Sequence, residues 1–116
     1  MQEFLFAVHH PEDQGVPDDL EDIFAAVDVF NTDLMAEARM PYAGGLQPTA
    51  TAKVVRAQGA SANTTDGPMN PGLAEPMGGF WVVRAEGMDE ALALAARAVR
   101  ACRAAVEVRP FQVEPE

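Results

Sequence analysis

The sequence predicts an α+β domain with the element order β-α-β-(short β)-β-α-β, the split pattern of a ferredoxin-like βαββαβ fold with one extra hairpin. Three observations predict it. Short alternating apolar segments near both ends indicate strands, two longer segments carry apolar residues at helical spacing, and a glycine-containing turn joins two strand-like segments in the middle. The chain is expected to form a single domain over residues 1–116, because this length supports one core.

The first strand is predicted over Glu3 to His9, where both alternating faces are largely apolar. The first helix is predicted to begin at Asp18 or Asp19, either of which can cap it, and to end near Met40. Its apolar residues recur at spacings of three and four and predict one buried stripe, made of Leu20, Ile23, Phe24, Val27, Phe30, Leu34 and Met35.

A turn-rich stretch is expected from Pro41 to Thr49, and a strand from about Ala50 to Ala57. Gly59 to Asn63 is predicted to turn the chain into a hairpin, whose return arm runs toward Asp66. These segments supply the middle of the predicted fold.

A further strand is predicted over Phe80 to Ala85 and the last one over Ala105 to Phe111, because apolar residues alternate in both. Between them, Asp89 is expected to cap a second helix that runs to about Arg103. Its predicted buried stripe is Leu92, Ala95, Ala96, Val99 and Cys102, which favours an inert thiol at Cys102 over a nucleophile.

Two helices can cover only one face of the predicted sheet. The other face still carries bulky apolar side chains, and such a patch is too large for an ordinary soluble monomer. A second copy of the chain is the simplest cover, so the sequence predicts a homodimer.

Charge and cysteine content exclude several classes of protein. Eight basic and eighteen acidic residues give a formal net charge of −10, which repels nucleic acids and anionic membrane surfaces. No apolar run approaches the length of about 18 residues that indicates a transmembrane helix. The lone Cys102 cannot form an internal disulfide and no signal peptide is recognisable, so we expect a cytoplasmic protein without nucleic-acid or membrane partners.

The most informative motif is Thr64-Thr65-Asp66-Gly67-Pro68-Met69, which places a carboxylate on a tight turn before the apolar strand at Phe80. Gly67 can adopt positive φ, and Pro68 disfavours a helical conformation at Gly67. Asp66 can accept hydrogen bonds from nearby main-chain amides, so its side chain is expected to be held in place.

This motif, followed by Gly78-Gly79 and an aromatic strand, resembles the signature of the YCII-related, or DGPF-domain, family of small bacterial proteins. Gly44 to Pro48, Met88 to Ala91 and Val106 to Pro110 occur in the family's order and spacing, so the resemblance covers most of the chain. Two features depart from the pattern. Met69 stands where the family has Phe, and the loop from Asn70 to Met77 is Pro-rich and one residue longer.

The resemblance implies a dimeric α+β barrel, in which two sheets pack around a shared interior. It also draws attention to His9 and Asp66, because a carboxylate can fix the tautomer of a histidine and raise its basicity. As a pair they would transfer protons. Alternatively, His9 is an ordinary strand-end residue and Asp66 an ordinary turn residue. His9, His10, Glu12 and Asp13 carry the imidazole and carboxylate groups that bind zinc and similar ions. Successive strand residues point to opposite faces and no paired helical or Cys ligands accompany them, so no metal and no other cofactor is expected.

Two functions remain open at this point. The first is a non-catalytic dimer that binds a small molecule or a protein partner, with Phe80, Trp81 and Met69 as the residues that contact a ligand. The second is a small-molecule isomerase or lyase that uses His9 and Asp66. The absence of phosphate-loop, nucleotide-binding and nucleophile-elbow motifs favours binding over catalysis.

Overall fold

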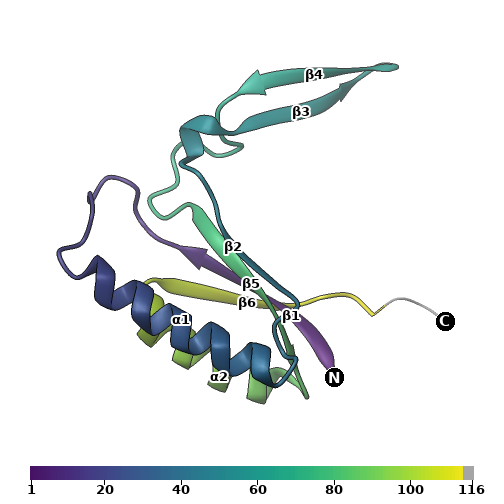
Figure 1. The fold of residues 1–116 in the computed structure, drawn as a ribbon. Coiled ribbons are helices and arrows are strands. Elements are labelled where there is room, and N and C mark those ends of the chain that lie inside the picture. The colour runs from purple at the N-terminus through teal and green to yellow at the C-terminus, as the bar shows by residue number, and fades with distance from the viewer. Residues whose placement is uncertain (114–116) are drawn as a thin grey trace.

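A four-stranded antiparallel sheet carries both helices on one face in the computed structural model, which describes residues 1–113 (Figure 1). The strand order is β2-β5-β1-β6, and every neighbouring pair is antiparallel. These elements are β1 (Gln2–His9), α1 (Leu20–Ala36), β2 (Tyr42–Gly45), β5 (Met77–Ala85), α2 (Met88–Cys102) and β6 (Ala105–Pro110). This α+β arrangement is compatible with the predicted ferredoxin-like fold.

The core lies between the sheet and the helices. The two central strands direct alternate side chains toward the helices, so the residues between them point to the opposite face. The large buried side chains are Phe4 and Phe6 from β1, Trp81 and Val83 from β5, Phe30 and Leu34 from α1, and Leu94 from α2. The predicted strand faces are therefore confirmed for β1 and β5.

The buried stripe of α2 differs from the prediction. Leu92 is 51% exposed and Val99 is 39% exposed, whereas the buried residues are Ala91, Leu94, Ala95, Ala98 and Ala101. The alanine-rich face is the one turned to the core, because small side chains let the helix lie close to its neighbours. Asp89 lies inside the first turn, and the N-cap position belongs to Gly87.

The buried stripe of α1 is only half formed. Phe30 and Leu34 are buried, but Phe24 and Met35 are both 60% exposed, and the remaining apolar residues of the first two turns are half-buried. Asp19 occupies the N-cap position without a capping hydrogen bond from its side chain, which instead forms an ion pair with Arg103. The first half of α1 therefore packs loosely over the sheet.

Strand β2 lies inside the segment that the sequence analysis assigned to turns. It pairs with β5 and forms one edge of the sheet, with Gly44 opposite Phe80 and Gly45 opposite Gly79. The glycines and flanking prolines suggested a turn, but pairing with β5 makes this stretch a strand.

The predicted hairpin exists as a separate two-stranded sheet. A short 3₁₀ helix, η1 (Thr49–Thr51), leads into β3 (Lys53–Gln58), and β4 (Ser61–Asp66) returns toward the body. The hairpin projects away from the rest of the molecule (Figure 1). The radius of gyration is accordingly 16.4 Å, compared with about 13 Å for a compact domain of this length.

Candidate functional site

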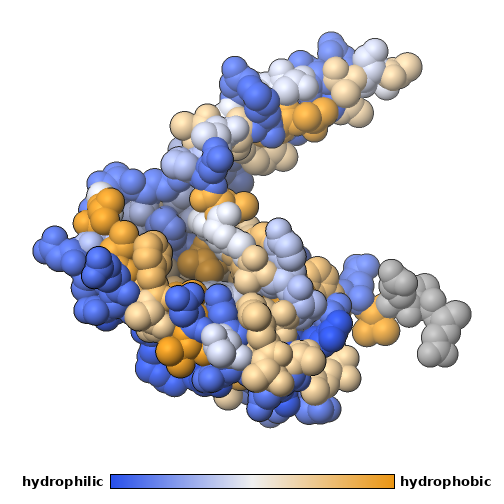
Figure 2. Space-filling view, in the orientation of Figure 1, coloured by the Kyte–Doolittle hydropathy of each residue, from blue (hydrophilic) through white to orange (hydrophobic). Residues whose placement is uncertain are grey.

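A groove of about 910 Å³ lies between the first half of α1 and the sheet. Figure 2 shows the hollow, with hydrophobic residues at its bottom. The groove exists because α1 does not pack down onto the sheet along its first turns. Its apolar walls are formed by Leu20, Ile23, Phe24 and Val27 from α1, with Val8 and Trp81 from the sheet.

Trp81 forms the floor of the groove and is the only tryptophan in the chain. The ring packs edge-to-face on Phe30, with 5.3 Å between the ring centroids. The indole Nε1 donates a hydrogen bond of 2.8 Å to Oδ1 of Asn31, which also borders the groove. These contacts fix the indole, so a ligand would meet a rigid aromatic floor with one amide beside it.

The loop that closes one end of the groove is tethered by Glu12. Its carboxylate accepts hydrogen bonds from the backbone N–H of Thr49 at 2.8 Å and from Thr49 Oγ1 at 2.5 Å. Hydrogen bonding by the Thr49 hydroxyl and amide lowers the pKa of Glu12. Because this pKa is depressed in the folded state, the tether is fully formed at neutral pH and is lost as the pH falls through the pKa of Glu12.

The groove lies in the acidic part of the molecule. Residues 1–38 contain ten acidic residues and no lysine or arginine. The other eight acidic residues of the chain are balanced by its eight basic residues, so the whole formal net charge of −10 comes from this N-terminal third. The charged residues that line the groove are Glu12, Asp19 and Arg103, and Asp19 and Arg103 form an ion pair. Glu12 therefore leaves the lining slightly acidic, which disfavours strongly anionic ligands.

Two residues that the sequence analysis did not select for ligand contact also line the groove. His10 packs its ring against Gly78, where an added Cβ would lie 2.4 Å from Nε2. Cys102 also lines the groove, and burial raises the pKa of its thiol, which favours the protonated form. Neither residue belongs to a recognisable sequence motif, so its position in the groove becomes apparent only from the packing of distant segments.

The structure places His9 and Asp66 with different partners. Nδ1 of His9 is 3.0 Å from the backbone oxygen of Glu75. The carboxylate of Asp66 pairs with Nζ of Lys53 at 2.6 Å, at the base of the hairpin. Among the described residues, no hydrogen bond or ion pair joins the two side chains, and neither of them lines the groove.

The turn after Asp66 has the backbone conformation that the motif predicts. Gly67 has a φ of 99°, and its N–H donates a hydrogen bond of 2.8 Å to the backbone oxygen of Ala52. Asp66 itself was expected to accept from main-chain amides, but its side chain pairs with Lys53 instead. The motif therefore closes the base of the hairpin.

The three predicted ligand contacts lie in different surroundings. Trp81 lines the groove, as described above. Phe80 borders it too, but its ring stacks on Tyr42 with 5.7 Å between centroids, and Tyr42 is not among the lining residues. Met69 is 60% exposed, and its sulfur lies 3.3 Å from an Arg56 nitrogen of the hairpin. Of the three, Trp81 and Phe80 line the groove and Met69 does not.

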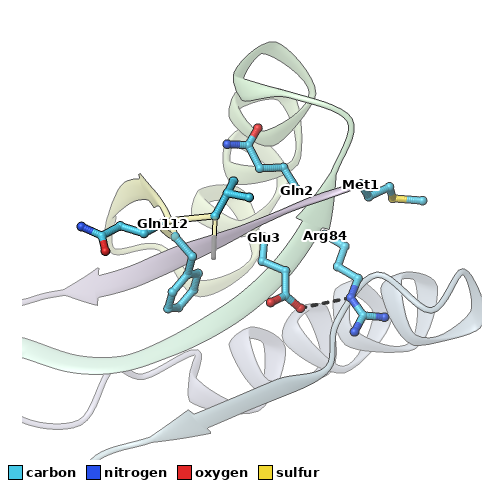
Figure 3. A pocket seen from close by; sticks show the side chains of 7 residues that line it. Met1, Gln2, Glu3, Arg84 and Gln112 are labelled. Carbon is cyan, nitrogen blue, oxygen red and sulfur yellow. Dashed lines mark hydrogen bonds and ion pairs between the residues drawn. The ribbon is translucent and has the colours of Figure 1, made fainter. Parts of the chain in front are cut away.

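A second hollow of about 360 Å³ lies where the chain ends meet the sheet (Figure 3). Its two charged residues, Glu3 and Arg84, form an ion pair of 3.2 Å with each other. The hollow is shallow, and its charges already satisfy one another. Within residues 1–113, no three His, Cys, Asp or Glu side chains gather as the ligands of a metal ion would.

Neither helix in the described part of the chain combines the length and the apolar character needed to cross a membrane. Comparison with known proteins adds no further constraint: no protein-family model matches this chain, and no curated protein sequence matches it.

Proposed function

We propose that this protein is a homodimeric, YCII-related binding protein that holds a small molecule in the groove between α1 and the sheet. The groove itself carries the proposal. A volume of about 910 Å³ lies within the range of about 300–1,000 Å³ typical of small-molecule sites. Mostly apolar walls with a few polar groups are also typical of such sites.

The lining residues define the class of ligand. Apolar side chains of α1 and the indole of Trp81 favour a flat, largely apolar molecule. His10 and Asn31 can each hydrogen-bond a polar group of the ligand. Glu12 is the one charged lining residue outside the Asp19–Arg103 ion pair, so the groove favours a neutral or cationic compound over an anion. We therefore propose a neutral or cationic aromatic compound with one or two polar substituents.

Binding has more support than proton transfer. A catalytic pair needs its two groups within hydrogen-bond reach of each other or of a shared substrate. His9 and Asp66 instead pair with Glu75 and Lys53. No observation at the groove favours the isomerase alternative, so the proposed role does not include a chemical step.

The homodimer is proposed from the face of the sheet that the helices leave uncovered. This face carries Phe80 and Val82 from β5 and Leu5 from β1, all half-buried, together with the exposed ring of Tyr42. The Glu3–Arg84 ion pair at one end and the β6 residues Glu107 and Arg109 lie on the same face and border this apolar centre. Covering such a surface with its counterpart on a second copy would bury it in a two-fold interface. The family resemblance implies the same arrangement.

We predict that light scattering at micromolar concentration will give about twice the chain mass of 12.4 kDa. The expected reason is burial of the uncovered sheet face, and an interface of roughly 800 Å² per partner is the usual size for a stable complex. Val82→Glu should convert the protein to monomers, because it would bury an unpaired charge in that interface. A wild-type protein that scatters as 12.4 kDa at all concentrations would contradict the proposed dimer.

Ligand binding can be tested with the neutral apolar fluorophore N-phenyl-1-naphthylamine. We expect its emission to rise on binding, and the emission of Trp81 to be quenched, because the indole forms the groove floor. Phe24→Asp should weaken binding by about tenfold or more, since removing one apolar contact and adding a charge costs at least about 1.4 kcal/mol.

Val29→Asp is the matched control for Phe24→Asp. Both residues lie on α1 and are similarly exposed, at 62% and 60%, but Val29 does not line the groove. The control should bind the fluorophore as the wild type does. Equal binding by both variants, or no quenching of Trp81 in the wild type, would rule out the groove as the site.

A further inference from the structure

The hairpin of β3 and β4 makes few contacts outside itself. Neither strand packs extensively on any other helix or strand, and every strand residue except Val54 is exposed. An isolated two-stranded hairpin is only marginally stable in water. The two strands nevertheless pair regularly through six residue pairs. A hairpin of this kind would be stabilised by packing against another surface.

The two faces of the hairpin differ in chemistry. The strand register places alternate residue pairs on opposite faces. One face is formed by small and apolar side chains, and beyond the Lys53–Asp66 ion pair it consists of Val55, Ala57, Ala62 and Thr64. The other carries mainly polar side chains, including Arg56, Gln58, Ser61 and Asn63. Val55 is 63% exposed, which is unusual for a valine on the apolar face of a strand pair.

The hairpin and the body are separated by open space. Figure 2 shows a wide opening between them, and the hydrophobic colours on the hairpin lie mostly along the side turned toward the body. No segment of the described chain fills this opening, so the apolar side of the hairpin is available to a second molecule.

We propose that the hairpin is an arm that reaches across to a second copy of this chain and packs its apolar face on that copy. This inference rests on the proposed homodimer and extends it. Each copy gives one arm and receives one, so a two-fold axis satisfies both arms at once. In this arrangement, the arm and the uncovered sheet face would both contribute to the contact between the two copies.

Interface size favours a second copy over an unrelated protein. Four small side chains cannot supply the 20 to 30 residues that each partner usually contributes to a stable complex. The arm therefore needs an adjoining contact surface, and the sheet face of the same chain provides one. In a homodimer, a single two-fold interface would cover the hairpin and the sheet face of each copy.

Charge is compatible with the same partner. Lys53 and Asp66 form an ion pair at the base of the hairpin, so Arg56 accounts for its net positive charge. Residues 1–38 carry the whole net negative charge, so the acidic body of another copy does not repel the hairpin. Its own body lies across the opening seen in Figure 2.

The test combines light scattering with hydrogen–deuterium exchange on the full chain. Val55→Asp should weaken dimerisation by about 30-fold or more, because it places a charge in the buried centre of a contact. Gln58→Asp is the matched control, since it adds the same charge to the same strand on the opposite face, and it should leave the dimer intact. Circular dichroism should show both variants folded, because neither side chain is part of the core.

Hydrogen–deuterium exchange tests the contact made by the hairpin independently of whether the protein is a dimer. Backbone amides of β3 and β4 should exchange slowly in the wild-type dimer and rapidly after dilution to monomer. A dimer whose hairpin amides exchange at the same rate in both states would overturn the arm and leave the homodimer standing. Equal weakening by Val55→Asp and Gln58→Asp would overturn the role of the apolar face. A wild-type chain that stays monomeric would overturn both the homodimer and the arm as a contact between two copies. The apolar face of the hairpin would then have to pack on a different protein.

Discussion

Phe6→Ala is expected to lower the free energy of unfolding by about 3–5 kcal/mol. Phe6 lies at the middle of β1, between Trp81 of β5 and Val108 of β6, and its side chain is 0% exposed. Truncation removes the apolar ring and leaves a cavity between the sheet and the helices. Urea-induced unfolding followed by circular dichroism measures the loss, and an unchanged slope would show that the midpoint shift reports stability alone.

Phe24→Ala is the control for this measurement, because it makes the same chemical change on a phenylalanine that is 60% exposed. It should change the free energy of unfolding by no more than about 0.5–1 kcal/mol. The same variant should weaken binding of the apolar fluorophore, since Phe24 lines the groove. Equal destabilisation by the two variants would contradict the structure, since it would mean that the first half of α1 is packed as firmly as the core.

That difference between the two phenylalanines could not be predicted from the sequence. The spacing of apolar residues predicts which side of α1 faces the sheet, and Phe30 and Leu34 confirm it. Spacing does not tell how far each turn lies from the sheet. That distance is set by tertiary packing between segments that are remote in the sequence, which a pattern of local spacing does not contain.

Local patterns predicted the strands best where alternation was strong. The core faces of β1 and β5 follow directly from the alternation of Phe4, Phe6, Trp81 and Val83. The edge strand β2 was missed because local patterning of Gly44 and Gly45 favours a turn, and only pairing with β5 makes them extended. In such segments tertiary pairing overrides local propensity.

The candidate site was predictable only in part. Phe80 and Trp81 were expected to lie on opposite faces, one in the helix-covered core and the other in a shared interior where it could contact a ligand. Trp81 lies on the helix-covered side and lines the groove there. His10 and Asn31 come from other elements and carry no motif that connects them with Trp81. The turn at Asp66 was predicted to have a fixed backbone conformation. It does, with positive φ at Gly67, but Asp66 pairs with Lys53 at the base of the hairpin and does not line the groove.

Gly79→Ala is expected to lower the free energy of unfolding by about 1–3 kcal/mol, the usual cost of overpacking. A Cβ at this position would lie 2.9 Å from the backbone oxygen of Gly44 and 3.3 Å from Cα of Gly45. These are backbone atoms of the neighbouring strand, so no side-chain rotation can relieve the clash. The edge strand β2 would have to move away from β5, and this would also displace a wall of the groove.

Gly45→Ala tests whether the effect comes from this close approach or from glycine content alone. Gly45 pairs directly with Gly79, but a Cβ at Gly45 meets no atom within 4 Å, and its φ is not positive. It should therefore be neutral, or stabilising by up to about 1 kcal/mol through the unfolded state. Thermal unfolding of the two variants beside the wild type decides between these outcomes. A Gly79→Ala protein as stable as Gly45→Ala would show that β2 is not held against β5, and the groove would then lack the fixed wall on which ligand binding depends.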